Sequence, residues 1–237
     1  MPSTASTTSI EDVHRERGEA GWYQLYATNQ WSVTEHLVRR AEAAGAPVLV
    51  LTVDLPAGRN TETEQRLRRE DKRDCAACHG DARLTYFRRK PMFAGLGIEL
   101  PISGLFHPAM DWVFVDRLRK LTKMKLVLKG IVHPADARLA VEHGVDGIIV
   151  SNHGGRAEES LRATVDCLPD IAKEVSGRMP VILDGGIRRG TDIFKAMALG
   201  ATAVAIGRPY LWALAAQGQA GVETVHRMLA DELTLVM

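Results

Sequence analysis

The chain has 237 residues, 46% of them hydrophobic and 25% charged, and its 30 Lys and Arg against 29 Asp and Glu give a net charge of +1. This composition excludes disordered and fibrous proteins. The charge balance lacks the excess of positive charge that is typical of proteins that bind nucleic acid or an anionic membrane. No apolar run approaches the ~18 residues of a membrane helix, and the first residues lack the pattern of a signal peptide. We therefore expect a cytoplasmic protein with one domain over residues 1–237.

Short apolar runs recur along the chain, and each ends in a polar residue or a glycine. The first expected strand ends near Tyr26, and the later strands are expected in Val48–Asp54, Lys125–Gly130, Gly147–His153, Pro180–Gly186 and Ala203–Arg208. Uninterrupted apolar runs of this length are typical of parallel strands that are buried on both faces.

Helical patterns lie between these strands. Ser32, with a glutamate three residues later, has the spacing of a capping box, and its helix is expected to end at Gly45. Pro134 is expected at the first position of a helix that Gly144 ends, and Thr191 is expected to cap another.

Strands that alternate with helices imply a parallel α/β sheet. The chemically distinctive residues all follow strand ends, which is where a TIM (β/α)8-type barrel carries its active site. We expect such a barrel in incomplete form, with about six βα units and two open sheet edges. A doubly wound sheet is the alternative, but no G-x-G-x-x-G follows the first strand.

The segment 58–90 interrupts the alternation because it is polar and heavily charged. One interpretation is a long lid loop over the strand ends, after the strand that ends at Asp54. The other is a solvated insertion that contains a short helix of mixed charge.

This segment also contains Cys75, Cys78 and His79, which have the C-x-x-C-H spacing of c-type haem attachment. Met92 would be the second axial ligand of such a haem. Haem attachment needs an export pathway, so a disulfide, a thiol pair or an incidental match is favoured over haem. Only three ligands lie close together, and no metal site is expected. Cys167, in a helical pattern, is interpreted as a core residue.

The strand ends together offer a set of groups suited to acid–base and anion-binding chemistry. His153 is a natural base near neutral pH, and a nearby carboxylate would stabilise its charged form. Arg156 can hold a carboxylate in a bidentate fork. Glycines leave backbone N–H groups accessible to a phosphate, and Arg188 and Arg208 would add positive charge to such a phosphate site.

Several motifs resemble the FMN-dependent α-hydroxy-acid oxidase and dehydrogenase family, which includes glycolate oxidase, lactate oxidase, mandelate dehydrogenase and flavocytochrome b2. The resemblance spans nearly the whole chain and rests on residues 22–26 (WYQLY), 51–54 (LTVD), 128–130 (LKG), 151–156 (SNHGGR) and 183–192 (LDGGIRRGTD). It implies FMN as the cofactor and the oxidation of a small L-2-hydroxy acid to the 2-oxo acid.

The resemblance also implies roles for individual residues. His153 is the expected base, Asp54 its carboxylate partner, and Tyr26 and Lys129 complete the catalytic set. Arg156, Tyr26 and Arg59 are expected to bind the substrate. Residues that match the family's cofactor contacts are Ser3, Gln24, Thr52, Lys129, Ser151, Asp184, Gly185, Gly186, Arg188, Gly207 and Arg208.

The sequence departs from the family at two places. Asn60 occupies the position of a second arginine, with Arg59 as its substitute, which affects the choice of substrate. The family also has more than about a hundred residues before the point that matches Met1. The alternative functions are a truncated or degenerate barrel without catalysis, or another FMN- or phosphate-binding barrel such as a flavin-dependent isomerase. The electron acceptor is left open between oxygen, a quinone and a cytochrome, and a homo-oligomer is expected.

Overall fold

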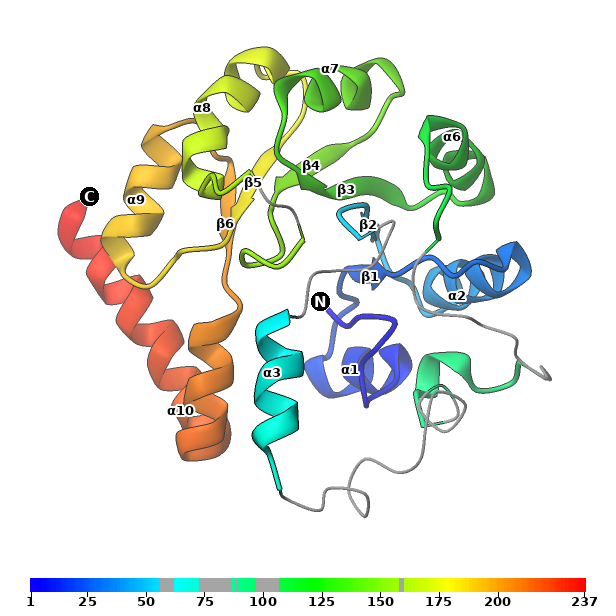
Figure 1. Cartoon of the computed structure of the whole chain (residues 1–237), viewed down its shortest axis with the longest axis horizontal. Helices are drawn as coiled ribbons and strands as arrows, with labels where there is room; N and C mark the ends of the chain where they lie inside the picture. The colour runs from blue at the N-terminus through cyan, green and yellow to red at the C-terminus, as the bar shows by residue number, and fades with distance from the viewer. Residues whose placement is uncertain (56–61, 73–86, 88, 97–106, 158–159) are drawn as a thin grey trace. The chain divides into compact units, whose positions relative to one another are not determined.

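The computed structural model describes residues 1–55, 62–72, 87, 89–96, 107–157 and 160–237. The chain divides into two compact units, Met1–Val127 and Leu128–Met237, each with its own parallel strands and covering helices (Figure 1). No helix among these residues has both the length and the apolar character needed to cross a membrane.

Unit 1 is built on two parallel strands, β1 (Tyr23–Leu25) and β2 (Val48–Thr52), with Gln24 opposite Val50. Every residue of both strands is buried, as the apolar runs predict. The helical segments described in this unit are α1 (Ile10–Arg17), α2 (Trp31–Ala43), α3 (Glu62–Glu70), the 3-10 turn η1 (Pro91–Phe93) and α6 (Trp112–Leu121).

The first residues of the chain lie along β1. The Gln24 backbone N–H donates to the carbonyl of Pro2 at 2.9 Å, and the Thr4 N–H donates to the carbonyl of Gln24 at 3.0 Å. Ser3 forms an isolated parallel bridge with Gln24 between these two bonds. Unit 1 thus has a third extended segment beside its two strands.

Glu42, in the last turn of α2, fixes the start of β3 (Lys125–Ile131) within unit 1. Its carboxylate accepts hydrogen bonds from the Lys123 backbone N–H at 2.7 Å and from the Thr122 hydroxyl at 2.8 Å. These two donors, the backbone N–H first, lower the pKa of Glu42 below its ordinary value.

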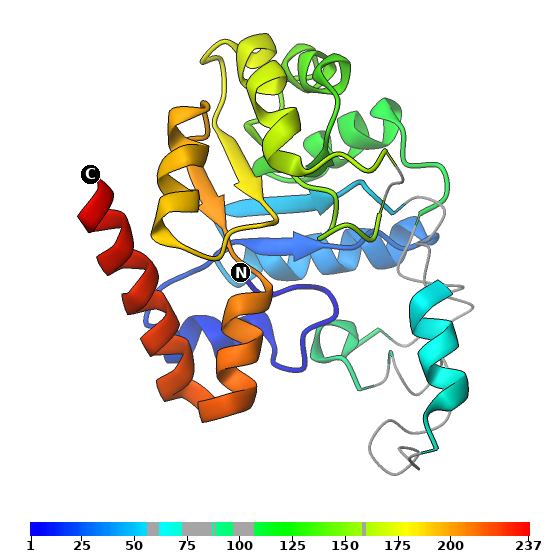
Figure 2. The ribbon, with the colours of Figure 1, turned by 60° about the vertical axis from the view of Figure 1, so that its left-hand side comes forward.

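Unit 2 contains the second half of β3 and three further parallel strands, β4 (Gly147–Val150), β5 (Val181–Asp184) and β6 (Ala203–Ala205). Its helices are α7 (Pro134–Glu142), α8 (Thr164–Val175), α9 (Gly190–Ala198) and α10 (Arg208–Val236). The chain bends within α10 at Gln217 and Gly218, and the second half of α10 lies beside α9 (Figure 2). There the Glu232 carboxylate accepts from the Gly190 N–H at 2.8 Å.

All six expected strands are present, and several expected helix boundaries are confirmed. Pro134 begins α7, and Gly45 and Gly144 follow α2 and α7 with positive φ angles of 84° and 66°. The exposed helix α3 agrees with the interpretation of a short helix of mixed charge. Cys167 is buried in α8 as expected.

Two expected caps are wrong. Ser32, an expected cap, lies inside α2, which starts at Trp31 with Gln30 as its cap, because the Thr34 hydroxyl accepts the Thr28 backbone N–H at 3.1 Å and draws in the preceding loop. Thr191, another expected cap, lies inside α9, which starts at Gly190 with Arg189 as its cap, two residues earlier than expected. The Asp192 carboxylate instead accepts the preceding backbone N–H groups of Arg188 and Arg189, at 2.9 Å each.

Candidate active site

The loop after β4 is a self-contained turn that presents His153 and Arg156. The carbonyl oxygen of Asn152 accepts from the backbone N–H groups of Gly155 and Arg156, each at 3.1 Å. Its side-chain oxygen accepts from Gly155 as well, at 2.9 Å. Gly154 and Gly155 adopt φ angles of 73° and 78°, a left-handed conformation in which glycine has no steric cost. The glycine pair therefore allows the tight turn that follows the strand.

His153 itself has a φ angle of 58°, which is uncommon for a residue with a side chain. The side chain of His153 is half-buried, whereas Arg156 is exposed and its Nε donates to the His153 carbonyl at 3.4 Å. A left-handed non-glycine residue persists where its surroundings hold it in place, and such residues concentrate at functional sites.

A charged network lies behind this loop, at the ends of β3, β4 and β5. The Lys129 ammonium donates to the Ser151 hydroxyl at 2.8 Å and lies 3.2 Å from an oxygen of Asp184. The Ser151 hydroxyl donates to the other Asp184 oxygen at 2.7 Å. Ser151 is fully buried, and the other two side chains are largely so. Three residues predicted from separate motifs thus form one hydrogen-bonded group.

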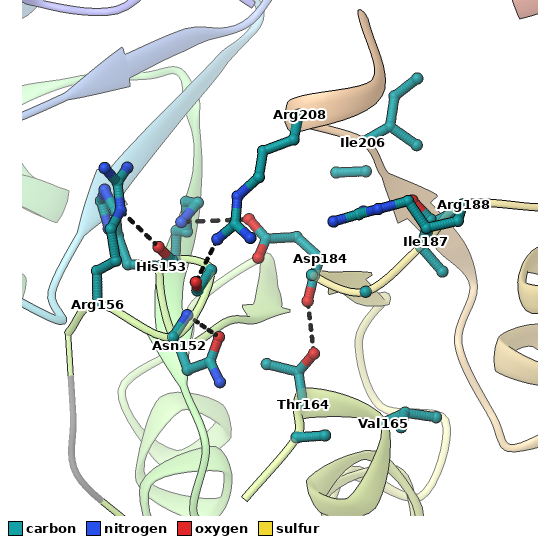
Figure 3. A pocket seen from close by; sticks show the side chains of 18 of the residues that line it. Asn152, His153, Arg156, Thr164, Val165, Asp184, Ile187, Arg188, Ile206 and Arg208 are labelled. Atoms are coloured by element: carbon teal, nitrogen blue, oxygen red, sulfur yellow. Dashed lines mark hydrogen bonds and ion pairs between the residues drawn. The ribbon is translucent and has the colours of Figure 1, made fainter. Parts of the chain in front are cut away.

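A cavity of about 490 Å³ opens beside this network, lined entirely by residues of unit 2 (Figure 3). Its polar lining includes Lys129, His153, Asp184, Arg188 and Arg208. The Arg208 guanidinium donates to the carbonyl of Gly154, so the start of α10 is tied to the loop after β4. This is the size range in which proteins bind small molecules and cofactors.

Unit 1 carries its own cluster of predicted site residues at the ends of β1 and β2. The Gln24 side-chain amide donates to the Thr52 hydroxyl at 2.7 Å, and both residues are buried. Tyr26 and Asp54, just beyond the strand ends, are half-buried. Ser3 lies beside Gln24 through the backbone bridge, while its hydroxyl accepts from the Ala5 N–H at 3.1 Å.

The Thr4 hydroxyl supports this cluster from the first segment. It accepts the Tyr26 backbone N–H at 3.0 Å and pairs with the Tyr23 hydroxyl at 2.9 Å. Burial raises the pKa of the Tyr23 phenol, so this side chain stays protonated and keeps its hydrogen bond.

Some predictions fall outside the described residues, namely Arg59 and the motif formed by Cys75, Cys78 and His79. Within the residues that are described, no group of three or more His, Cys, Asp or Glu is arranged to hold a metal ion.

Sequence reasoning missed several residues of the cavity, among them Asn152 and Thr164. Asn152 organises the turn, and its place inside the 151–156 motif is a signal that could have identified it. Thr164 donates its hydroxyl to the backbone carbonyl of Asp184 at 2.7 Å, and no motif surrounds it.

Comparison with known proteins identifies the family. The model of the FMN-dependent dehydrogenase family matches residues 1–237, and the chain belongs to this family. It is 44% identical over 239 residues to a 2-hydroxyacid oxidase of Dictyostelium discoideum, covering 99% of this chain and 59% of that protein. It is 41% identical over 243 residues to an L-lactate oxidase of Lysinibacillus sphaericus, covering 98% and 61%. The chain thus spans about three fifths of the length of these relatives.

Solved structures agree with the fold. A mandelate oxidase crystallised with (S)-2-phenylpropionate is 36% identical with a TM-score of 0.79, covering 98% of this chain and 63% of that chain. A mandelate oxidase mutant with (S)-mandelic acid is 37% identical with a TM-score of 0.80, at the same coverage. The predicted fold class, a TIM-type barrel represented by six of its βα units, is confirmed, and the family indicates FMN as the cofactor.

Proposed function

We propose that this chain takes part in the FMN-dependent oxidation of a small L-2-hydroxy acid to the corresponding 2-oxo acid. The observation that carries the proposal is the unit 2 cavity. It combines a base, His153, with cations suited to a phosphate, Arg188 and Arg208, and with a lysine that is held by a serine and an aspartate. Family membership and relatives named as 2-hydroxyacid and lactate oxidases support it.

The residues at the end of the cavity nearest β5 and β6 fit the phosphate-bearing cofactor of the family. A Cβ atom added to Gly186 or Gly207 would meet no other atom within 4 Å, so space lies open beside both backbones. Arg188 and Arg208 line the same cavity and supply fixed positive charge. Open glycine backbone next to guanidinium groups is an arrangement that binds phosphate. When bound, FMN supplies the two-electron acceptor for the reaction.

Lys129 and Asp184 set the charge on the cofactor side of the cavity. Lys129 has its ammonium next to the Asp184 carboxylate, at 3.2 Å, so each of these largely buried charges has a partner of opposite sign. A positive charge at this place is suited to lie next to an electron-rich acceptor atom, where it favours the gain of electrons. Asp184 keeps the lysine in place, and its carboxylate is itself suited to accept hydrogen bonds from hydroxyl groups.

Arg156 and His153 are proposed to act on the substrate. An exposed guanidinium at the rim of the cavity can bind the carboxylate of a 2-hydroxy acid through two parallel hydrogen bonds. His153, three residues earlier on the same turn, is the group that would take a proton from the substrate. The roles predicted for Asp54, Tyr26, Gln24 and Thr52 belong to the same proposal and are supported by their places at the ends of β1 and β2.

The proposal is tested by anaerobic reduction of the FMN-loaded chain. We expect stoichiometric FMN binding, followed by loss of the oxidised-flavin absorbance when L-lactate, glycolate or mandelate is added. Subsequent addition of oxygen, a quinone or cytochrome c identifies the electron acceptor. Bound FMN that none of these hydroxy acids reduces would count against the proposed reaction.

The cellular setting is a further part of the proposal. We propose a cytoplasmic homo-oligomer, in keeping with the ordinary composition and the near-neutral charge of the sequence. Cell fractionation and analytical ultracentrifugation of the purified chain test these two points separately.

A further inference from the structure

Two carboxylates hold the loop between β5 and α9, which brings Arg188 to the cavity. Asp192, in the first turn of α9, accepts the backbone N–H groups of Arg188 and Arg189 at 2.9 Å each. Glu232 accepts the next backbone N–H along the chain, that of Gly190, at 2.8 Å. Three consecutive N–H groups at the start of α9 are thus bound by carboxylates, one from α9 itself and one from the far end of α10.

Glu232 also forms an ion pair with the residue that follows Arg188. The Nε atom of Arg189 lies 2.8 Å from one oxygen of the Glu232 carboxylate and 2.9 Å from the other. These donors, the guanidinium first and the Gly190 N–H second, lower the pKa of the Glu232 carboxyl below its ordinary value, so the group is ionised at neutral pH. Arg188 is thus directed to the cavity, whereas Arg189 is directed to Glu232.

The main chain of α10 lies directly against the start of α9. Gly190 is buried, and a Cβ atom added to it would collide with the backbone of Glu232 and Leu233. Glycine therefore allows the two helices to approach each other at this point. The Glu232 carboxylate reaches the Gly190 N–H from a backbone that is itself packed against the loop.

The first half of α10 contacts the same end of the cavity. Arg208, the first residue of α10, lines the cavity, and the ring centre of Trp212 lies 5.1 Å from the guanidinium carbon of Arg188. A guanidinium at this distance from an aromatic ring is attracted to it. Because α10 turns back at Gly218, both of its halves contact the loop that carries Arg188.

We propose that Glu232 is a positioning residue for the phosphate end of the cavity: by binding the side chain of Arg189 and the backbone of Gly190, it fixes the loop that carries Arg188. The inference rests on the proposed function for the identity of the ligand. The hold of Glu232 on the loop is measured without any flavin, so the inference and the proposed function can fail separately.

The first measurement uses the full chain without FMN. In the Glu232→Ala variant the Gly190 amide loses its acceptor, and we expect its hydrogen exchange, measured residue by residue, to accelerate at least about tenfold. The matched control is Asp231→Asn, which changes an exposed acidic residue in the same turn of α10 and should leave this exchange unchanged. If exchange at Gly190 is the same in the wild type and in Glu232→Ala, Glu232 does not hold the loop and the inference fails.

The second measurement compares FMN with riboflavin, which lacks the phosphate. If Glu232 acts on the loop of Arg188, Glu232→Ala should weaken FMN binding by about tenfold and change riboflavin binding by less than about twofold. Glu232→Gln keeps an acceptor for the Gly190 N–H and loses the ion pair, so a smaller loss of FMN affinity is expected. A purely structural contact between α9 and α10 predicts that both flavins are affected equally or not at all, and this result would overturn the proposal.

A double-mutant cycle with Arg188→Met determines whether the effect passes through Arg188. Once this arginine is absent, Glu232→Ala should weaken FMN binding by less than about twofold, because the loop no longer carries the group that Glu232 positions. Additive losses from the two substitutions would contradict the proposal. The rate of flavin reduction at saturating FMN and hydroxy acid should stay within about twofold of the wild type in Glu232→Ala, because the proposed base, His153, lies on another loop.

A wild-type chain that binds no FMN would contradict the proposed function. The exchange of the Gly190 amide would still decide whether Glu232 holds the loop. Loss of FMN binding in Asp231→Asn equal to that in Glu232→Ala would assign the effect to the general charge of α10, and it would overturn the specific role of Glu232.

Discussion

Arg156 is the exposed cation at the rim of the unit 2 cavity, and we expect it to bind the substrate carboxylate. Arg156→Met removes charge-assisted hydrogen bonds worth about 1.5–3 kcal/mol, so KM for the hydroxy acid should rise by about 10- to 100-fold. FMN affinity should not change. Steady-state kinetics with L-lactate or glycolate measure the effect, and Arg138→Met, an exposed arginine on α7, is the control. An unchanged KM with a reduced kcat would contradict the assignment.

Gly154 and Gly155 allow a second comparison at the level of single residues. Both have positive φ angles, so alanine at either position should destabilise the fold by about 1–2 kcal/mol. Only at Gly154 would the new Cβ meet the Arg208 guanidinium, at 2.5 Å, whereas at Gly155 it would meet no atom within 4 Å.

We therefore expect Gly154→Ala, but not Gly155→Ala, to displace Arg208 and weaken FMN binding by about tenfold. Fluorescence titration of the two variants gives the comparison directly. Equal FMN affinities in both variants would mean that the position of Arg208 does not depend on this contact.

The sequence predicted the members of the candidate site better than the bonds between them. The motifs placed Lys129, Ser151 and Asp184 at three strand ends, since apolar runs show where strands stop. Which atoms meet depends on side-chain rotamers, and no sequence pattern reports these. The link from Arg208 to Gly154 joins residues 54 positions apart, at the start of α10 and in the loop after β4, and only the fold reveals it.

At the level of secondary-structure elements, Glu42 makes stability depend on pH. Its folded pKa is lowered by donors at the start of β3, so its contribution is complete above its ordinary pKa of 4.5 and is lost as the pH falls through the lower folded value. Glu42→Gln should therefore reduce the free energy of unfolding by about 1 kcal/mol at pH 7, after screening by solvent.

The difference between Glu42→Gln and the wild type should shrink as the pH falls below 4.5. Urea denaturation at pH 7 and at pH 3.5 measures it. Glu35→Gln, a substitution in the same helix, provides the control. A difference for Glu42→Gln that is constant across this range would rule out the proposed ionic contribution.

Elements were predicted reliably where the apolar pattern was continuous. Five of the six strands have this pattern, whereas β1 contains the polar Gln24, and all six were found. Two helices start at other residues than expected because side chains inside the helix bind the backbone N–H groups of the preceding loop. Thr34 does this for α2 and Asp192 for α9. Helices α1 and α6 were not predicted. Each begins with a side-chain cap, at Ser9 and at Asp111, and this is the signal that could have located them.

At the scale of the whole molecule, cofactor binding should appear as thermal stabilisation. A ligand at about 100 times its dissociation constant adds about 2.7 kcal/mol, which for a chain of this length raises Tm by about 5–10 °C. Riboflavin lacks the phosphate that Arg188 and Arg208 are proposed to bind, so it should raise Tm less than FMN. Calorimetry with both ligands measures the difference, and equal shifts would argue against a phosphate site at these arginines.

The segment along β1 affects how the chain can be handled in the laboratory. A strand whose edge already has a hydrogen-bonded neighbour cannot recruit another polypeptide through its backbone, and Pro2 and Thr4 occupy that edge at Gln24. Trimming these residues with an aminopeptidase would uncover the edge and favour self-association. It would also loosen the strand whose Gln24 side chain reaches Thr52. A purification tag is therefore better attached after Met237, which is 88% exposed, than before Met1.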